Sequence, residues 1–340
     1  MRVLLVAPPS DARLHSLVPL GWALRTGGHE VQIAGKAACT EAITMTGFVA
    51  VPVGVDGPPG PDGPSSPADG GGPELSAPSD VESLVAYASA WRPELIVWDT
   101  MAPAGAEAAR AVGAASVRLK GPHDRRTGPA GGSGAAAYCH ATLDCLPPSL
   151  REPDGSDPLG VRYVPYGGSA VLPPWLRRKP RRRRVHLAAG VPDAALAGVL
   201  GAAGGVDVEM VCELEEGRIP AGTVLPSHTR LFDSVPLHAL LPSCTAVVHG
   251  GGTPDVMAAL VDGLPQLAVG DTGGTGPAAR LAERGAGLLV APGEVTAAML
   301  ERLVGDPELA TRATELREEI TAMPSPREIV PELVTIAARR

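Results

Sequence analysis

A glycine-rich turn between a predicted strand and a predicted helix is the segment of this sequence best suited to chemistry. The apolar run 246–248 leads into Gly250, Gly251 and Gly252, and an apolar pattern with helical spacing follows. A strand, a glycine turn and a helix N-terminus can form an anion site, because backbone N–H groups and the helix dipole point at a bound phosphate. Asp255 lies in the first turn of that helix. Its carboxylate is expected to occupy the place that a diphosphate needs.

The bulk properties indicate an ordinary globular protein and argue against several classes of function. The 340 residues are 44% hydrophobic and 19% charged, and the net charge of −8 disfavours nucleic acid as a partner. The apolar N-terminal run is too short for a membrane span and has no signal-peptide pattern, so the expected location is the cytoplasm, away from membranes. The five cysteines are scattered without a CxxC pair, and no residues have metal-ligand spacing.

Short apolar runs alternate with helical patterns in two successive series. A Pro- and Arg-rich segment separates the series, which predicts two doubly wound, Rossmann-like α/β domains facing across a cleft. Residues 177–184 hold seven basic side chains in eight, which indicates a solvated linker or, alternatively, an anion-binding or acidic-partner patch. The expected organisation is an N-terminal domain over 1–165 with a flexible loop at 57–73, a linker over 166–184, a C-terminal domain over 185–318, and a helix over 319–340 that returns to the N-terminal domain.

The sequence also resembles a known enzyme family. Similar segments are LVPLGWALRTGGHEV, ELIVWDT, RYVPYGGSAVLPPWL, VPLHALLPSCTAVVHGGG, DGLPQLAV and ARLAERGAGLLVAP, which resemble parts of the two-domain GT-B glycosyltransferases of macrolide, anthracycline and related natural-product pathways. The resemblance implies an acceptor-type N-terminal domain and a donor-type C-terminal domain that binds a nucleotide sugar. Members of this family are usually longer, and the stretch around 121–160 is where we expect the missing residues.

The catalytic positions implied by the resemblance are partly changed. The family's general base is a histidine six residues before the proline of LVPL. That position is Arg13, which cannot accept a proton at physiological pH. His15 is an alternative base, although an offset of two residues turns its side chain to another face of the helix. The acid that pairs with the family's base has a match in Asp99. His123 and Asp124 follow Gly-Pro, where the family has Gly-Pro-Asp, and are further candidates for acid–base chemistry unless they belong to a solvated loop.

The donor-side positions implied by the resemblance are changed as well. The family's diphosphate-binding histidine falls on Gly250, and its hydroxyl residue in the first turn of the helix falls on Asp255. Its acid–amide pair for the sugar hydroxyls falls on Gly273 and Gly274, and a Ser or Thr that meets the phosphates falls on Pro192. These changes predict a degraded donor site, in which the glycine turn and Asp255 no longer bind a diphosphate.

Three functions are compatible with this pattern. The first is a repurposed tailoring enzyme that uses acid–base chemistry on a small polyketide-like ligand in the N-terminal domain, without a cofactor or a metal. The second is a non-catalytic partner of another glycosyltransferase. The third is an active glycosyltransferase with an atypical donor site, which binds a TDP-sugar. We expect the first, and we leave open whether the chain forms a homodimer or a complex with a glycosyltransferase.

Overall fold

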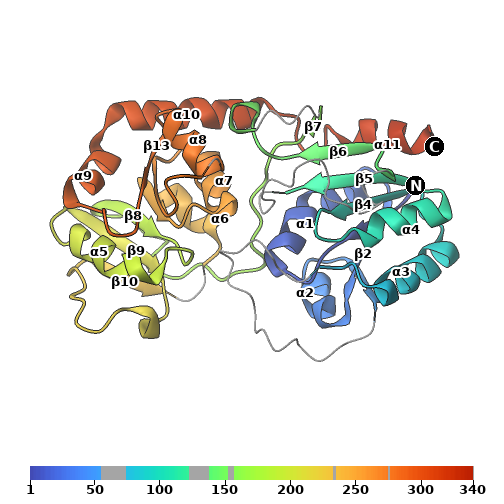
Figure 1. The fold of residues 1–340 in the computed structure, drawn as a ribbon, viewed down its shortest axis with the longest axis horizontal. Coiled ribbons are helices and arrows are strands. Elements are labelled where there is room, and N and C mark those ends of the chain that lie inside the picture. Colours follow the sequence, from blue (N-terminus) through green and yellow to red (C-terminus); the bar gives the residue numbers. More distant parts are fainter. Residues whose placement is uncertain (55–73, 122–137, 152–156, 233–234, 275, 340) are drawn as a thin grey trace. The chain divides into compact units, whose positions relative to one another are not determined.

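The chain forms two α/β units. The computed structural model describes residues 1–54, 74–121, 138–151, 157–232, 235–274 and 276–339. Unit 1 comprises Met1–Leu146, Glu152–Ser169 and Met323–Arg340, and unit 2 comprises Pro147–Arg151 and Ala170–Ala322. Figure 1 colours the chain from blue to red, and its last helix, in red, lies with the blue and green elements of unit 1. Two Rossmann-like units confirm the predicted fold class, while the predicted cleft between them stays a prediction.

Unit 1 is built on a parallel sheet with the strand order β3-β2-β1-β4-β5-β6-β7. Both faces of this sheet are buried, because successive side chains of the apolar strand β1 point to opposite faces. Leu5 packs with residues of α1, α2 and α11, whereas Leu4 packs with residues of α3 and α4. The elements are β1 (Arg2–Val6), α1 (Asp11–Thr26), β2 (Glu30–Lys36), α2 (Thr40–Met45), β3 (Val49–Val53), α3 (Pro78–Trp91), β4 (Leu95–Asp99), α4 (Ala104–Val112), β5 (Ala115–Lys120), β6 (Ala141–Asp144), β7 (Leu159–Gly160) and α11 (Val330–Ala338).

Unit 2 is built on a second parallel sheet, with the strand order β10-β9-β8-β11-β12-β13. Leu196 of α5 and Leu300 of α9 pack with apolar residues of β8 and β9, and Ala259 of α7 packs with Val247 of β11. The elements are β8 (Arg183–Leu187), α5 (Asp193–Ala203), β9 (Val208–Glu213), β10 (Thr229–Phe232), α6 (Leu237–Leu240), β11 (Ala246–His249), α7 (Thr253–Val261), β12 (Gln266–Val269), α8 (Pro277–Glu283), β13 (Gly287–Val290), α9 (Ala297–Gly305) and α10 (Pro307–Ala322).

The basic segment predicted as a linker runs into the second sheet. β8 begins at Arg183, and the next residue, Arg184, is buried. Its guanidinium tolerates burial because a carboxylate pairs with its charge and an aromatic ring lies close to it. Its guanidinium donates to Glu209 through Nη2 at 3.0 Å and lies 5.2 Å from the centroid of the Trp175 ring. Arg184, the last residue of the basic run, is therefore part of the core of unit 2, whereas residues 181–183 are exposed.

Two further boundaries differ from the predicted domains. Pro147–Arg151 was expected in the N-terminal domain but belongs to unit 2. There the Ser149 hydroxyl and backbone N–H donate to the two oxygens of Glu319 at 2.5 and 2.8 Å. The final segment of unit 1 begins at Met323, four residues later than expected. The predicted loop at 57–73 lies outside the described residues.

Candidate functional site

An ion pair connects the first turn of α1 to the end of β4. β1 and β4 are parallel neighbours, so the helix that follows β1 begins near the carboxyl end of β4. Arg13 Nη1 donates to Asp99 Oδ1 at 2.9 Å, and the same oxygen accepts the Met101 N–H at 2.9 Å. Asp99 is only 1% exposed. The predicted acid is thus held by a guanidinium, which cannot take a proton from an acceptor hydroxyl.

His15 lies on the same helix but has different neighbours. Its ring meets Tyr166 edge to face, with centroids 5.2 Å apart at 84°. A Cβ atom placed on Gly168 would lie 3.5 Å from His15 Nε2, so the imidazole faces the segment that leads out of unit 1. Burial lowers the pKa of His15, and the Asp11 carboxylate partly offsets this effect. The imidazole is therefore neutral at pH 7 and chemically able to accept a proton, although it points at Tyr166 rather than at Asp99.

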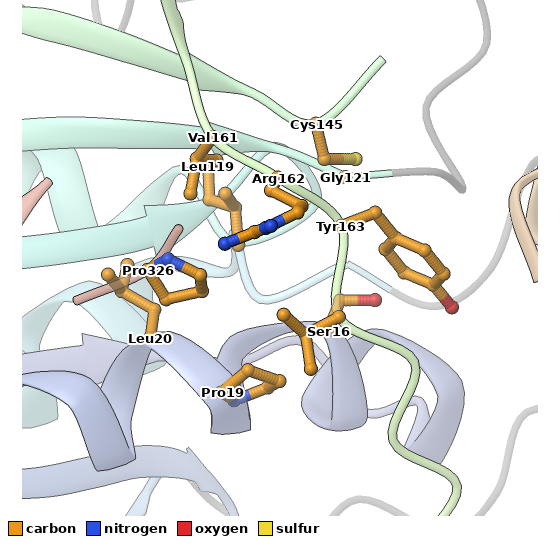
Figure 2. A pocket seen from close by; sticks show the side chains of 11 residues that line it. Ser16, Pro19, Leu20, Leu119, Gly121, Cys145, Val161, Arg162, Tyr163 and Pro326 are labelled. Atoms are coloured by element: carbon orange, nitrogen blue, oxygen red, sulfur yellow. The ribbon is translucent and has the colours of Figure 1, made fainter. Parts of the chain in front are cut away.

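A small pocket in unit 1 lies beside these groups (Figure 2). Its volume of about 30 Å³ holds one or two water molecules. Figure 2 shows the Arg162 side chain reaching into it, with Ser16 on α1 below. A Cβ atom on Gly121 would lie 4.0 Å from Asp99 Oδ2, which places that carboxylate at the edge of the pocket. The lining residues are Ser16, Pro19, Leu20, Leu119, Gly121, Cys145, Val161, Arg162, Tyr163, Val164 and Pro326. His123 and Asp124 lie outside the described residues.

In unit 2, the glycine turn is fixed by a buried histidine. The N–H of Gly251 donates to His249 Nδ1 at 2.9 Å, and Gly251 adopts a positive φ of 84°. The other ring nitrogen, His249 Nε2, therefore carries the proton and donates to Gln266 Oε1 at 2.9 Å, while Gln266 Nε2 donates to the Val256 carbonyl at 3.2 Å. Burial lowers the pKa of His249 to about 4. His249 is consequently a neutral group that shapes the turn.

The loop between β8 and α5 lies directly against the glycine turn. A Cβ atom on Gly250 would lie 1.9 Å from the Gly190 carbonyl oxygen, so no side chain fits at this position unless the backbone moves. Arg218 holds the loop from the other side through three acceptors. Its guanidinium donates to the Ala189 and Val191 carbonyls at 2.6 and 3.0 Å and to Asp193 Oδ1 at 2.6 Å. The absence of a side chain at position 250 is thus a packing requirement of this loop.

Two carboxyl groups meet at the same edge of the second sheet. Asp255, in the first turn of α7, places Oδ2 3.3 Å from a Cβ atom built on Gly190 and 3.6 Å from one built on Gly252. Glu213 ends β9 and accepts the Ala189 N–H. Burial raises the pKa of Asp255 to about 6. Burial and the charge of Asp255 raise the pKa of Glu213 to about 7, against the opposing effect of the Ala189 hydrogen bond. The pair carries less than two full negative charges at neutral pH.

Sequence reasoning missed two of these residues. Glu213 and Arg218 contribute to the donor-side edge, and the available signal for Glu213 was an acid at the carboxyl end of a strand, as for Asp99. No local pattern indicated Arg218, because its acceptors lie about 25 residues earlier in the chain. Gly273 donates its N–H to Asp271 Oδ1 at 2.9 Å, so an acid stands two residues before the position where the resemblance implies one.

The described part of the chain contains neither a candidate metal cluster nor a membrane-spanning helix. There, no three His, Cys, Asp or Glu side chains gather in a way that could hold a metal ion. No helix among the described residues is both long and apolar enough to cross a membrane.

Comparisons with known proteins match both units. The family model for the C-terminal domain of erythromycin biosynthesis protein CIII-like proteins matches residues 197–336, and the N-terminal model of that family matches 75–130 and 119–190. The chain is 34% identical to 10-deoxymethynolide desosaminyltransferase of Streptomyces venezuelae, covering 100% of this chain and 98% of the relative. It is 35% identical to aklavinone 7-beta-L-rhodosaminyltransferase of Streptomyces galilaeus, covering 100% and 96%. The crystal structure of glycosyltransferase VinC in complex with DTDP is 31% identical, covers 100% of both chains and superposes with a TM-score of 0.84.

These comparisons bear on two of the sequence-based hypotheses. The two pieces of the N-terminal family match meet within 119–130, at the start of the stretch where residues were expected to be missing. The hypothesis of a degraded donor site receives no support from the comparisons. Both relatives are named as sugar transferases, and the match covers 98% and 96% of their lengths. The roles of the individual site residues stay predictions.

Proposed function

Because the chain belongs to the erythromycin biosynthesis protein CIII-like family of GT-B glycosyltransferases of natural-product biosynthesis, we propose that it transfers a sugar from a thymidine diphosphate donor to a polyketide-type acceptor. The observation that carries the proposal is the glycine turn of unit 2. It lies at the carboxyl end of β11 and opens α7, which is the place where an open parallel sheet binds phosphates. An active glycosyltransferase with an atypical donor site was the third of the functions considered from the sequence.

The donor would be held by backbone N–H groups, because Gly250 stands where the resemblance implies a diphosphate-binding histidine. In the first turn of α7, the N–H groups of Thr253 and Asp255 have no carbonyl of their own helix to bind, and Pro254 has no N–H. These two N–H groups and the positive end of the helix dipole would bind the diphosphate. The sugar hydroxyls would face the loop around Asp271.

The acceptor would lie in unit 1, beside the Asp99 carboxylate. During transfer, the acceptor hydroxyl oxygen bonds to the anomeric carbon, the bond from that carbon to the diphosphate oxygen breaks, and the hydroxyl proton passes to a base. Arg13 cannot be this base. His15 is neutral at pH 7 and would accept the proton after turning away from Tyr166.

The test is a transfer assay with defined probes. The purified chain is incubated with TDP-desosamine or TDP-glucose and with 10-deoxymethynolide or aklavinone, and products are read by mass spectrometry. We expect a glycoside of at least one acceptor, and we expect His15→Asn to lower kcat by about 100-fold or more, the contribution of a general base. Arg25→Leu, a change on the exposed face of the same helix, is the matched control and should leave kcat unchanged. Absence of any glycoside, together with absence of TDP binding, would refute the proposal.

A second function is favoured by one observation, the Arg13–Asp99 ion pair. An acid that is permanently paired with arginine suits a protein that binds a polyketide-like ligand and acts on it without a sugar donor. His15 would then be the remaining acid–base group, and no cofactor would be needed. This alternative predicts that aklavinone raises the melting temperature whereas TDP and the TDP-sugars leave it unchanged. A homodimer or a glycosyltransferase partner stays an untested prediction in both cases.

A further inference from the structure

The carboxyl group of Asp255 stands where the negative charges of a bound diphosphate would lie. It is in the first turn of α7, and its Oδ2 atom lies between the glycine turn and the β8–α5 loop, close to Gly190 and Gly252. No other side chain among the described residues donates a hydrogen bond to it. A carboxylate and a diphosphate that lie next to each other in a partly buried site repel each other strongly. If the diphosphate binds here, the charge of Asp255 must be removed.

We propose that Asp255 binds the donor diphosphate as a neutral carboxylic acid that donates a hydrogen bond, so that one proton is taken up with each nucleotide. A protonated carboxyl group has one O–H donor, which is the capability that a serine or threonine hydroxyl offers to a phosphate. The inference rests on the proposed function, since it assigns a role within the donor site of that function. It makes Asp255 a substrate-binding residue rather than a remnant of a lost site.

The surroundings of Asp255 favour the neutral form. On β9, Glu213 is a second carboxyl group, and its pKa is raised by burial and by the charge of Asp255, so it offers Asp255 no compensating positive charge. On the β8–α5 loop, Asp193 is paired with Arg218, whose guanidinium is also engaged by two carbonyls of that loop. On β11, His249 is neutral because it is fully buried. The cations among these neighbours are therefore engaged elsewhere, and the burial that raises the pKa of Asp255 to about 6 supports the same protonation state.

The direction of the pH dependence follows from this arrangement. Above the pKa of Asp255 the free protein holds a carboxylate, so binding requires a proton from solvent. The dissociation constant for the nucleotide should then rise by about tenfold per pH unit, from about pH 6 towards about pH 8. Asp255→Asn supplies an N–H donor of the same shape that needs no proton, and it should bind the nucleotide more tightly than the wild type at about pH 8.

The experiment is calorimetric titration of the full chain with TDP at several pH values, in two buffers of different ionisation enthalpy. TDP has its own titrating phosphate, and comparison with Asp255→Asn cancels that contribution. Asp262→Asn is the matched control, because Asp262 follows the last residue of the same helix and is far from the glycine turn. We expect uptake of about one proton by the wild type and by Asp262→Asn, and a weaker pH dependence for Asp255→Asn.

Three outcomes separate this inference from the proposed function. Proton uptake that disappears in Asp255→Asn supports the inference. TDP binding by the wild type without proton uptake overturns it and leaves the proposed function standing. No TDP binding by either the wild type or Asp255→Asn at any pH overturns the proposed function, and the inference with it. The outcome that overturns the inference is measured on the wild type alone, whereas the supporting outcome requires a folded Asp255→Asn, which circular dichroism of that variant checks.

Discussion

Replacing Arg13 with leucine should destabilise unit 1 strongly, although the replacement of a charged side chain on a helix usually changes stability little. The guanidinium lies 2.9 Å from Asp99 Oδ1, and the two side chains are only 10% and 1% exposed. Arg13→Leu removes the cation and leaves a buried carboxylate without it, a change that costs about 3–5 kcal/mol of unfolding free energy. By comparison, Arg25 is exposed and donates one hydrogen bond to the Gly47 carbonyl, so Arg25→Leu should cost only about 1 kcal/mol.

The measurement is urea unfolding followed by tryptophan fluorescence. Trp22, Trp91 and Trp98 lie in unit 1, and only Trp175 lies in unit 2, so the signal reports mainly on the unit that contains the ion pair. Arg13→Leu combined with Asp99→Asn should recover part of the loss, because the double variant leaves no buried charge unpaired. A loss below about 1 kcal/mol for Arg13→Leu alone would refute the view that this ion pair is buried and essential to unit 1.

Two further predictions concern unit 2. Gly250→Ala should lower the unfolding free energy by about 1–3 kcal/mol, because its Cβ would meet the Gly190 carbonyl at 1.9 Å. Gly201→Ala, in α5 with nothing within 4 Å of its Cβ, should instead raise it by about 0.5–1 kcal/mol, and urea unfolding of both variants checks the pair. Burial lowers the pKa values of His186 and His249 to about 4, so the unfolded chain binds more protons than the folded one below the ordinary value of 6.5. Taken alone, each histidine should cost about 1.4 kcal/mol of stability per pH unit as the pH falls from 6.5 towards 4, whereas the raised pKa values of Asp255 and Glu213 act in the opposite direction. Urea unfolding of the wild type and of His186→Gln at several pH values isolates the contribution of His186, and an identical pH dependence in the two proteins would contradict its assigned neutral state.

The fold was predictable because its signals are local. Apolar runs such as 3–6 and 246–248 are short, continuous and followed by helical patterns, which is the signature of parallel strands buried on both faces. The glycine turn and the acid at the end of β4 were found in the same way. Their identification needed only the residue types and their place relative to a strand.

The contacts that decide the chemistry were not predictable from local pattern. Arg184 reads as one more residue of a basic run, and only the fold shows that Glu209 and Trp175 bury it. The approach of Gly190 to Gly250 joins loops that are 60 residues apart in the sequence. The family resemblance indicated that a histidine was missing at position 250, whereas the structure shows what lies in its place.

The return of the chain to unit 1 has a consequence for how the protein is made. Ile329, Val330, Leu333 and Ala337 all belong to the same buried cluster as Leu5 and Leu17, although more than 300 residues separate them from those partners. The first sheet can therefore form early on the ribosome together with α1 and α2, but the part of its face that α11 covers stays exposed until the last helix has left the exit tunnel. During that interval the nascent chain exposes an apolar surface of unit 1, which is the kind of surface that chaperones bind.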